Sequence, residues 1–205
     1  MENDVLRSLT YGLFVLSVHC GKRDNACIIN TAIQTANTPD RIVFSVNKGN
    51  FTCEMLDYSD DVTLSVVSED ADFDLFRTFG FVSGRETEKF DGFDECERVA
   101  NGTLAVTRGT NAWISARIEQ RIDLGSHVLF IAVVTDGKKL SSVPSATYAY
   151  YHTHIKPAPQ PAPTAANGKK RWRCAVCGWE YEGDELPEDL VCPICKHPAS
   201  DFELV

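Results

Sequence analysis

Four cysteines near the C-terminus have the spacing of a metal-binding site. Cys174 and Cys177 form one C-x-x-C pair, and Cys192 and Cys195 form a second pair after 14 intervening residues. A tetrahedron of four thiolates suits Zn(II) or iron. The segment that holds them, Lys169 to Val205, has little else to fold around, so metal binding would supply much of its folding free energy. Zinc would make this tail a structural module, whereas iron would make it an electron carrier.

The residues around these cysteines bear on the choice of metal. Gly178 follows the first pair and permits the tight backbone turn of a metal knuckle, and Pro193 lies inside the second pair. The aromatic residues that could form a small core are Trp172, Trp179, Tyr181 and Phe202. The pairs of a zinc ribbon stand about 15–20 residues apart, which nearly includes this spacing. Spacing alone therefore leaves zinc open.

The run R-W-R-C-A-V-C-G-W-E-Y-E-G-D-E-L-P-E-D-L-V-C-P-I-C-K-H-P-A-S-D-F-E resembles rubredoxin along its whole length. It has that family's aromatic-x-C-x-x-C-G opening, its Leu-Pro-x-Asp turn and its C-P-x-C closing followed by Asp-Phe-Glu. The loop between the two pairs is shorter than in most rubredoxins. The resemblance implies that Cys174, Cys177, Cys192 and Cys195 hold one iron, which exchanges one electron, with zinc as a substitute.

A proline-rich stretch separates this tail from the rest of the chain. Four prolines alternate with small residues between 155 and 170, and this composition favours extended polyproline II. The chain has 205 residues and so exceeds the usual single domain of about 100–150. We expect a large domain over 1–154, a linker over 155–170 and a metal-bound domain over 171–205. The linker is either a passive spacer or a tether that lets the tail visit a site.

Charge and cysteine usage limit the classes of function. The net charge is −9 with no long basic run, which argues against nucleic-acid binding. The other cysteines, Cys20, Cys27, Cys53 and Cys96, are scattered singly; we expect ordinary reduced thiols in a cytoplasmic protein. The first apolar run, Leu13 to Val18, is too short for a signal peptide or a membrane span. No association with a membrane is expected.

Strands are predicted to dominate the large domain, and the clearest signal is the alternation of apolar and polar residues over Ile114–Leu124. The predicted strands are Leu13–His19, Ala26–Asn30, Arg41–Val46, Val62–Val67, Thr103–Thr107, Ile114–Leu124 and His127–Thr135. Short helices are expected over Phe51–Tyr58 and Asp72–Phe79. The last strand stops at Asp136-Gly137, a strong hairpin signal. Seven strands with few helices to cross between parallel neighbours indicate a mainly β fold, a mostly antiparallel barrel.

Segments of this domain occur in the order found in the flavin-reductase-like, FMN-binding split barrels. The segments that carry the resemblance are Tyr11–Ser17, Asn25–Ala36, Pro39–Lys48, Asn50–Thr52, Leu124–His127 and Tyr148–His152. The resemblance covers Leu6 to Lys156 and implies an antiparallel FMN-binding split barrel with a few short helices. One departure is Gly125-Ser126-His127, where many members have Gly-Asp-His.

The resemblance also implies a set of cofactor contacts. The implied FMN contacts are Asn30, Thr31 and Gln34 at the pyrimidine edge and Asn47, Lys48 and Thr52 at the phosphate. His127 would lie near the reactive face of the flavin and orient a nicotinamide or a redox partner, which makes it the candidate catalytic residue. Structural interpretations stay open for these residues: Asn30 and Thr31 as turn residues, Lys48 as a solvated charge and His127 as a core histidine.

The two modules together resemble the high-molecular-weight rubredoxins of anaerobes. In that family electrons pass from NAD(P)H through FMN to the iron and on to a flavodiiron protein, which reduces O2 or nitric oxide. The resemblance implies an NAD(P)H-dependent flavin/rubredoxin oxidoreductase that forms a homodimer. Two alternatives stay open: a non-enzymatic electron carrier whose FMN is reduced by another protein, and a flavin-free binding protein with a structural zinc ribbon.

Overall fold

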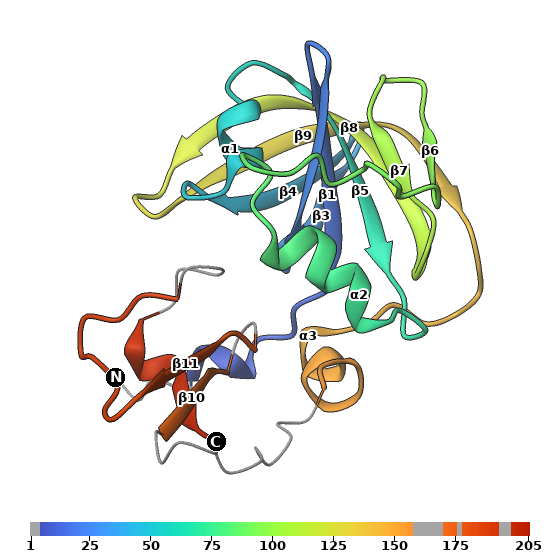
Figure 1. The fold of residues 1–205 in the computed structure, drawn as a ribbon. Coiled ribbons are helices and arrows are strands. Elements are labelled where there is room, and N and C mark those ends of the chain that lie inside the picture. The colour runs from blue at the N-terminus through green and yellow to red at the C-terminus, as the bar shows by residue number, and fades with distance from the viewer. Residues whose placement is uncertain (1–4, 158–169, 176–177, 193–197) are drawn as a thin grey trace. The chain divides into compact units, whose positions relative to one another are not determined.

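The computed structural model describes residues 5–157, 170–175, 178–192 and 198–205 (Figure 1). The chain separates into two compact units, Met1–Lys156 and Pro157–Val205. Most of the predicted linker, 158–169, lies outside the described residues. Its conformation, and the domain boundaries expected at 154 and 171, therefore stay predictions.

Strands dominate the first unit. They are β1 (Phe14–Cys20), β2 (Arg23–Ile29), β3 (Ala32–Asn37), β4 (Asp40–Asn47), β5 (Asp61–Val67), β6 (Cys96–Arg98), β7 (Leu104–Val106), β8 (Thr110–Asp123) and β9 (His127–Lys139). The helices are short: a 3-10 turn (Val5–Ser8), α1 (Phe51–Met55), α2 (Phe73–Phe76) with a π-helical turn (Arg77–Phe81), and α3 (Tyr148–Tyr150) with a π-helical turn (Tyr151–Ile155).

Seven of these strands form one antiparallel sheet in the order β2-β1-β5-β8-β9-β4-β3. The two edge strands, β2 and β3, are consecutive in the chain, and only Asn30 and Thr31 connect them. So short a connection between opposite edges requires the sheet to roll up until these edges meet at one end (Figure 1). The unit is an antiparallel barrel with a seam between β2 and β3, which confirms the predicted mainly β fold.

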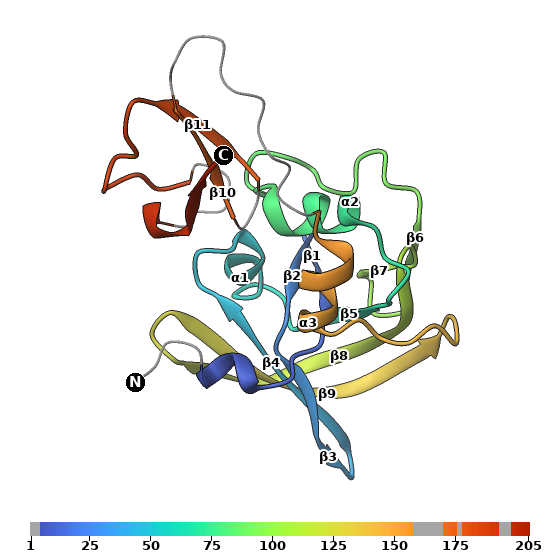
Figure 2. The same ribbon diagram turned by 90° about the horizontal axis from the view of Figure 1, so that it is seen from below.

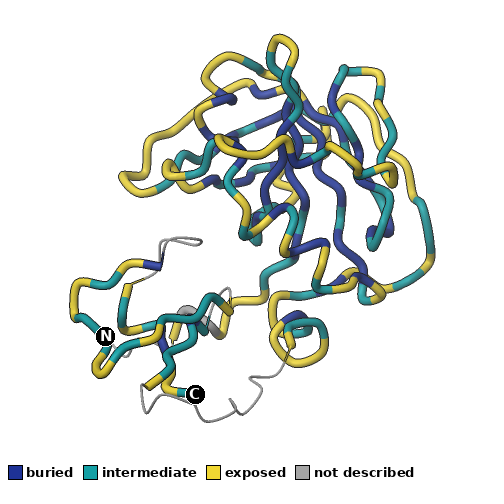
Figure 3. The backbone as a smooth tube through the Cα atoms, viewed as in Figure 1, coloured by how far each residue is buried: buried dark blue, intermediate teal, exposed yellow. Residues whose placement is uncertain are grey.

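Alternate residues of the strands fill the barrel interior. Leu16 and Val18 of β1 face Phe44 of β4 and Phe130 of β9 inside a buried cluster that α1 closes with Met55. The Phe44 and Phe130 rings stack with centroids 5.1 Å apart. Figure 3 shows the buried residues concentrated along these strands. Each such side chain contributes about 1.5–3 kcal/mol by leaving water, so the interior is the main source of stability.

A second core covers the outer side of β1, β2 and β5. Val15 of β1 and Val67 of β5 pack there against Phe76 of α2 and Tyr151, which follows α3. The Phe76 and Tyr151 ring centroids lie 4.4 Å apart. Figure 2 shows α2 and α3 on the same side of these strands. Strand β1 is therefore buried on both faces over Val15–Val18.

The predicted hairpin at Asp136-Gly137 is wrong. Strand β9 continues through these residues to Lys139, and the reversal lies between β8 and β9 at 124–126. Asp136 pairs with Ser115 and Gly137 with Ile114, next to a bulge in the ladder. A β-carbon on Gly137 would lie 3.2 Å from the Trp113 carbonyl oxygen. The glycine therefore serves a close backbone approach rather than a turn.

The other predicted strands and helices are present with shifted ends. Strand β8 begins four residues earlier than expected, and the helix over Asp72–Phe79 becomes α2 and a π-helical turn. Strands β3 and β6 and helix α3 were not predicted. No helix within the described residues is long and apolar enough to cross a membrane.

The second unit is a small sheet of three strands. They are β10 (Lys170–Cys174), β11 (Glu180–Gly183) and β12 (Phe202–Leu204), in the order β11-β10-β12, with a 3-10 turn at Ala199–Asp201. Its core consists of Cys174, Cys192 and Phe202, with Trp172, Trp179, Tyr181, Leu186 and Leu190 packed against them. The predicted aromatic core of the tail is therefore present, with two cysteines at its centre.

Candidate functional site

The loop between β4 and α1 carries two of the predicted FMN contacts. Asn47 shapes the loop, because its Oδ1 accepts a hydrogen bond of 2.8 Å from the Gly49 N–H. The Lys48 N–H donates to the Ser126 carbonyl at 3.0 Å, and Lys48 Nζ lies 2.6 Å from Asp123 Oδ1. The hydrogen bonds from Lys48 and from the Gly125 N–H lower the pKa of the Asp123 carboxyl. The loop is thus held against the β8–β9 turn.

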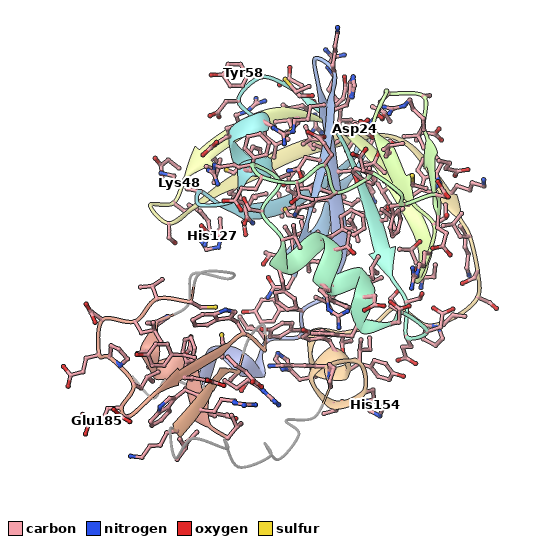
Figure 4. The ribbon with its side chains drawn as sticks, in the orientation of Figure 1. Asp24, Lys48, Tyr58, His127, His154 and Glu185 are labelled. Carbon is pink, nitrogen blue, oxygen red and sulfur yellow. The ribbon has the colours of Figure 1, made fainter. Side chains whose placement is uncertain are left out.

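His127 lies in the same place. It is the first residue of β9 and pairs with Asn47 across the β4–β9 ladder. Its Nδ1 lies 2.9 Å from Ser126 Oγ, and its ring is partly exposed, so it is not a core histidine. Figure 4 shows His127 and Lys48 together at one end of the barrel. The structure therefore brings Asn47, Lys48 and His127 together from two strands.

Asn30 and Thr31 reach this end from the barrel seam. The Thr31 hydroxyl donates to Asn30 Oδ1 at 3.0 Å, and the Ser45 N–H donates to the Thr31 carbonyl at 3.3 Å. Ser45 lies two residues before Asn47 on β4. Both side chains are partly exposed, so they offer polar groups one strand away from the β4–α1 loop.

Two of the predicted FMN contacts, Gln34 and Thr52, do not present their side chains beside Asn47, Lys48 and His127. Gln34 is exposed and donates to Asp40 Oδ1 at 2.9 Å; it pairs with Ile42, about 16 Å along β4 from Asn47 at 3.3 Å per residue. The Thr52 side chain is 1% exposed, and its hydroxyl accepts a hydrogen bond of 2.9 Å from Asn25 Nδ2 inside the protein. The Thr52 hydroxyl is therefore already bonded within the core.

Arg85 joins this site although the sequence analysis did not select it. Its Nη1 donates to the Gly49 carbonyl at 3.3 Å, its guanidinium pairs with Glu54, and its Cζ lies 5.6 Å from the Phe51 ring centroid. The contact joins positions 36 residues apart, and a single arginine in a glycine-containing turn carries no sequence signal of its own.

Half of the predicted metal ligands lie within the described residues. Cys174 and Cys192 are 1% and 0% exposed. The Cys174 carbonyl accepts a hydrogen bond of 2.8 Å from the Gly178 N–H, and the Cys174 N–H donates to Trp179 at 2.8 Å. Gly178 has a φ of +81°, the left-handed conformation that a knuckle turn requires. Cys177 and Cys195 lie outside the described residues.

The remaining cysteines behave as ordinary thiols. Burial raises the pKa of Cys27 and of Cys96, and burial raises the pKa of Cys53 to about 11. Thiols with raised pKa values are poor nucleophiles and poor metal ligands at neutral pH. No role at either site is proposed for these three.

Family models match both units. The flavin reductase like domain model matches residues 6–159, and the rubrerythrin, rubredoxin-like domain model matches residues 172–203. The first match covers well over half of the chain. The chain therefore belongs to the flavin reductase like family, and it carries a rubredoxin-like domain after the barrel.

One relative matches the whole chain, and another matches most of it. A high molecular weight rubredoxin of Moorella thermoacetica is 32% identical, and the match covers all of both chains. A ferric-chelate reductase (NAD(P)H) of Archaeoglobus fulgidus is 30% identical over 74% of this chain and 89% of its own. The chain is thus a homologue of a high molecular weight rubredoxin. Its two modules make it an electron-transfer oxidoreductase with a flavin-binding fold and a rubredoxin-like iron-binding domain.

Solved structures support the fold of the first unit. An FMN-binding protein from Thermus thermophilus, crystallised with 1-cyclohex-2-enone, superimposes with a TM-score of 0.60 at 20% identity. The superposition covers 68% of this chain and 76% of the other. At this identity the likeness concerns the fold alone, and it agrees with the flavin reductase like family.

Proposed function

We propose that this protein passes electrons from NAD(P)H through FMN to an iron bound by Cys174, Cys177, Cys192 and Cys195, and then to a partner such as a flavodiiron O2/NO reductase. One observation carries the proposal: the flavin reductase like barrel and the rubredoxin-like domain occur in one chain, and a high molecular weight rubredoxin matches both end to end. FMN would supply the conversion between two-electron hydride chemistry and single-electron steps.

The chain's own residues fit FMN at the end of the barrel where β4 meets α1. Lys48 offers a cation to the phosphate, and Asn47 keeps the loop in shape through its bond to Gly49. Asn30 and Thr31 offer donors and acceptors to the pyrimidine edge. Thr52 is left out of the proposed contacts, because the residue is buried and its hydroxyl is already bonded to Asn25.

His127 is the proposed catalytic residue. It is partly exposed beside Lys48 and Asn47, so its ring can contact a nicotinamide that approaches the flavin. The 2.9 Å contact with Ser126 Oγ orients the ring.

The second unit fits an iron with four sulfur ligands. The two described cysteines are buried within an aromatic core, which keeps water from the sulfurs. Burial and hydrogen bonds around the sulfurs tune the potential of such a centre. Iron would supply a one-electron acceptor for the flavin domain.

A homodimer is the proposed assembly, with a sheet face as the interface. In the ladders β3–β4–β9–β8, side chains that pair directly share a face. By this register the outer face carries Ile33, Val43, Ile131, Leu129 and Ile122. Ile33 is 64% exposed and Ile122 is 41% exposed. Ser45 and Gln120 lie on the same face, so the apolar residues form clusters on it; exposed apolar clusters of this kind support association with a second copy.

The visible spectrum and the reduction rate test the electron-transfer function. Protein purified in air should show both oxidised flavin bands and the red-brown absorption of ferric tetrathiolate. Anaerobic stopped-flow mixing with NADH or NADPH should bleach the flavin first and the iron afterwards. A colourless protein with stoichiometric zinc would contradict the redox function. Bleaching only after addition of another reduced protein would favour the non-enzymatic carrier.

A further inference from the structure

A second cation lies beside the loop that carries Asn47 and Lys48. Arg85 Nη1 donates to the Gly49 carbonyl of that loop at 3.3 Å. The Arg85 guanidinium carbon lies 5.6 Å from the Phe51 ring centroid, and that of Arg23 lies 4.8 Å from the same ring. Two arginines from different parts of the chain therefore flank the Phe51 ring at the start of α1, and Lys48 lies three residues before that ring in the sequence.

The segment that carries Arg85 is held firmly. The carbonyl of its neighbour Gly84 accepts a hydrogen bond of 2.6 Å from Arg23 Nη2. Gly84 is buried against Asn25, whose Oδ1 lies 2.2 Å from where a β-carbon of Gly84 would be. Further on, the buried Lys89 Nζ donates to the Ala26 and Phe79 carbonyls at 2.9 and 3.1 Å. The backbone on both sides of Arg85 is therefore anchored, which reduces the entropy lost when the segment binds a ligand.

The carboxylate partners of these cations are weak competitors for an anionic ligand. Arg85 pairs with Glu54, Arg23 with Glu88 and Lys48 with Asp123, and each of these carboxylates is about half exposed or more. Exposed ion pairs contribute little to stability. A phosphate monoester offers close to two negative charges and three acceptor oxygens, and arginine binds it with two parallel hydrogen bonds.

We propose that Arg85 is a ligand of the flavin's terminal phosphate, acting together with Lys48. Glu54 and the phosphate compete for the same guanidinium. The Phe51 ring keeps that guanidinium beside the β4–α1 loop when Glu54 is displaced. This assignment rests on the proposed binding of FMN at that loop, and it names the group that distinguishes FMN from riboflavin.

The test compares the affinities of FMN and riboflavin in the full-length protein, measured by quenching of flavin fluorescence. Charge-assisted hydrogen bonds to phosphate are worth roughly 10- to 100-fold in affinity. Arg85→Met should weaken FMN binding by about that factor and leave riboflavin binding unchanged. Arg77→Met is the matched control, because Arg77 also pairs with an exposed carboxylate and also lies 5.6 Å from a phenylalanine ring.

Other outcomes separate this assignment from the proposed function. Equal FMN affinity in wild type and Arg85→Met would overturn the role of Arg85 while flavin binding stands. Equal losses of affinity for FMN and riboflavin would show that Arg85 only supports the fold. That outcome would also overturn the assignment of Arg85 as a phosphate ligand. Failure of the wild type to bind either flavin would overturn the flavin function itself. Glu54→Gln, which removes the competitor, should tighten FMN binding several-fold, and weaker binding would contradict the competition.

Discussion

At the scale of single residues, Gly84 shows how a buried amide restricts a neighbouring position. A β-carbon there would lie 2.2 Å from Asn25 Oδ1 and 2.7 Å from its Cγ. Asn25 is 2% exposed and bonded to Thr52, so it cannot move without breaking a buried hydrogen bond. Gly84→Ala should lower the free energy of unfolding by about 1–3 kcal/mol, the usual cost of overpacking, as measured by urea denaturation.

The control for this prediction is Gly80→Ala. A β-carbon on Gly80 would meet Ile28 at 3.5 Å, an ordinary van der Waals contact. This variant should stay within about 0.5 kcal/mol of wild type, as substitutions without a specific clash usually do. If both alanines cost the same, the conflict with Asn25 is not the cause of the Gly84 effect.

Asp24 should make stability depend on acid pH. Burial alone would raise the pKa of its carboxyl, but hydrogen bonds from Arg98 and His19 outweigh burial and lower it. Because the folded state then favours the ionised form, Asp24 stabilises the protein above its unfolded pKa of about 3.9. This contribution is lost as the pH falls through the lowered folded pKa.

The measurement for Asp24 is a series of urea denaturations from pH 6 to pH 2.5. Asp24→Asn cannot ionise, so it should be less stable than wild type at pH 6, and the difference should shrink toward pH 2.5. Curves that stay parallel across this range would show that the Asp24 pKa is the same in the folded and unfolded states.

Local chemistry explains which site residues could be predicted from sequence. Asn47 and His127 were identified from short segments, and the structure pairs them directly across β4 and β9. The burial of the Thr52 hydroxyl depends on Asn25, and the position of Arg85 depends on Gly49, 36 residues away. Contacts between distant positions leave no pattern in one sequence, so these two outcomes required the structure.

At the scale of elements, a chain of hydroxyl groups attaches the β6–β7 hairpin to the sheet. Thr103 Oγ1 donates to Thr63 Oγ1 at 2.6 Å, and Thr63 lies 2.9 Å from Ser115 Oγ. The Val106 N–H donates to Ser65 Oγ at 2.9 Å. These serine and threonine side chains are fully or almost fully buried. Polar residues within strands β5 and β8 thus specify where the hairpin packs.

Thr63→Val should destabilise the protein by about 1–3 kcal/mol, because it leaves the buried hydroxyls of Thr103 and Ser115 without a common partner. The effect should be local: amide hydrogen exchange in β6 and β7 should accelerate more than in β1. Thr87→Val, at an exposed position, is the control. It should change neither the free energy of unfolding nor the rates of amide hydrogen exchange in β6 and β7. Uniform acceleration across all strands would contradict the role assigned to this hydroxyl chain.

The β8–β9 ribbon shows where patterns along the chain are misleading. The alternating run of residues predicted β8 and the apolar run predicted β9, because the burial of side chains follows a regular pattern along a strand. Asp136-Gly137 has turn chemistry, yet it lies inside the ladder beside a bulge at Ser115. Gly125, which has a φ of +86°, lies in the actual turn. Both sites need a glycine, so composition alone cannot distinguish a turn from a bulge.

At the scale of the whole molecule, the apolar outer face of β3–β4–β9–β8 should mediate dimer formation. Ile33→Glu places a charge on this face at a residue that is 64% exposed, so the monomer fold should tolerate it. The dimer dissociation constant should rise at least tenfold, as expected for burying an unpaired charge. Sedimentation velocity across a range of concentrations measures this change.

Val82→Glu is the control for the dimer prediction. Val82 is also an exposed apolar residue, 37% accessible, but it lies after α2 and outside the outer face of β3–β4–β9–β8. This variant should remain dimeric. Wild-type protein that sediments as a monomer at high concentration, or Ile33→Glu that dimerises as wild type does, would exclude this face as the interface.

The two modules should function as separable parts of one electron path. Cys192 is fully buried beside Phe202, and a serine hydroxyl is a much poorer ligand for iron than a thiolate. Cys192→Ser should therefore abolish the ferric tetrathiolate absorption and the transfer of electrons to a partner protein. Flavin affinity and the rate of flavin reduction by NAD(P)H should stay within about twofold of wild type, because the barrel has its own core.

Cys96→Ser distinguishes loss of the metal from loss of a thiol in general. The Cys96 thiol donates to the Phe93 carbonyl at 3.3 Å, and a serine can make the same bond. The flavin absorption and the ferric tetrathiolate absorption should therefore both remain as in wild type. Loss of flavin binding in Cys192→Ser would show that the barrel depends on the metal-bound tail. Unchanged electron output in that variant would place the exit of electrons at the flavin and leave the four cysteines a structural role, as in a zinc ribbon.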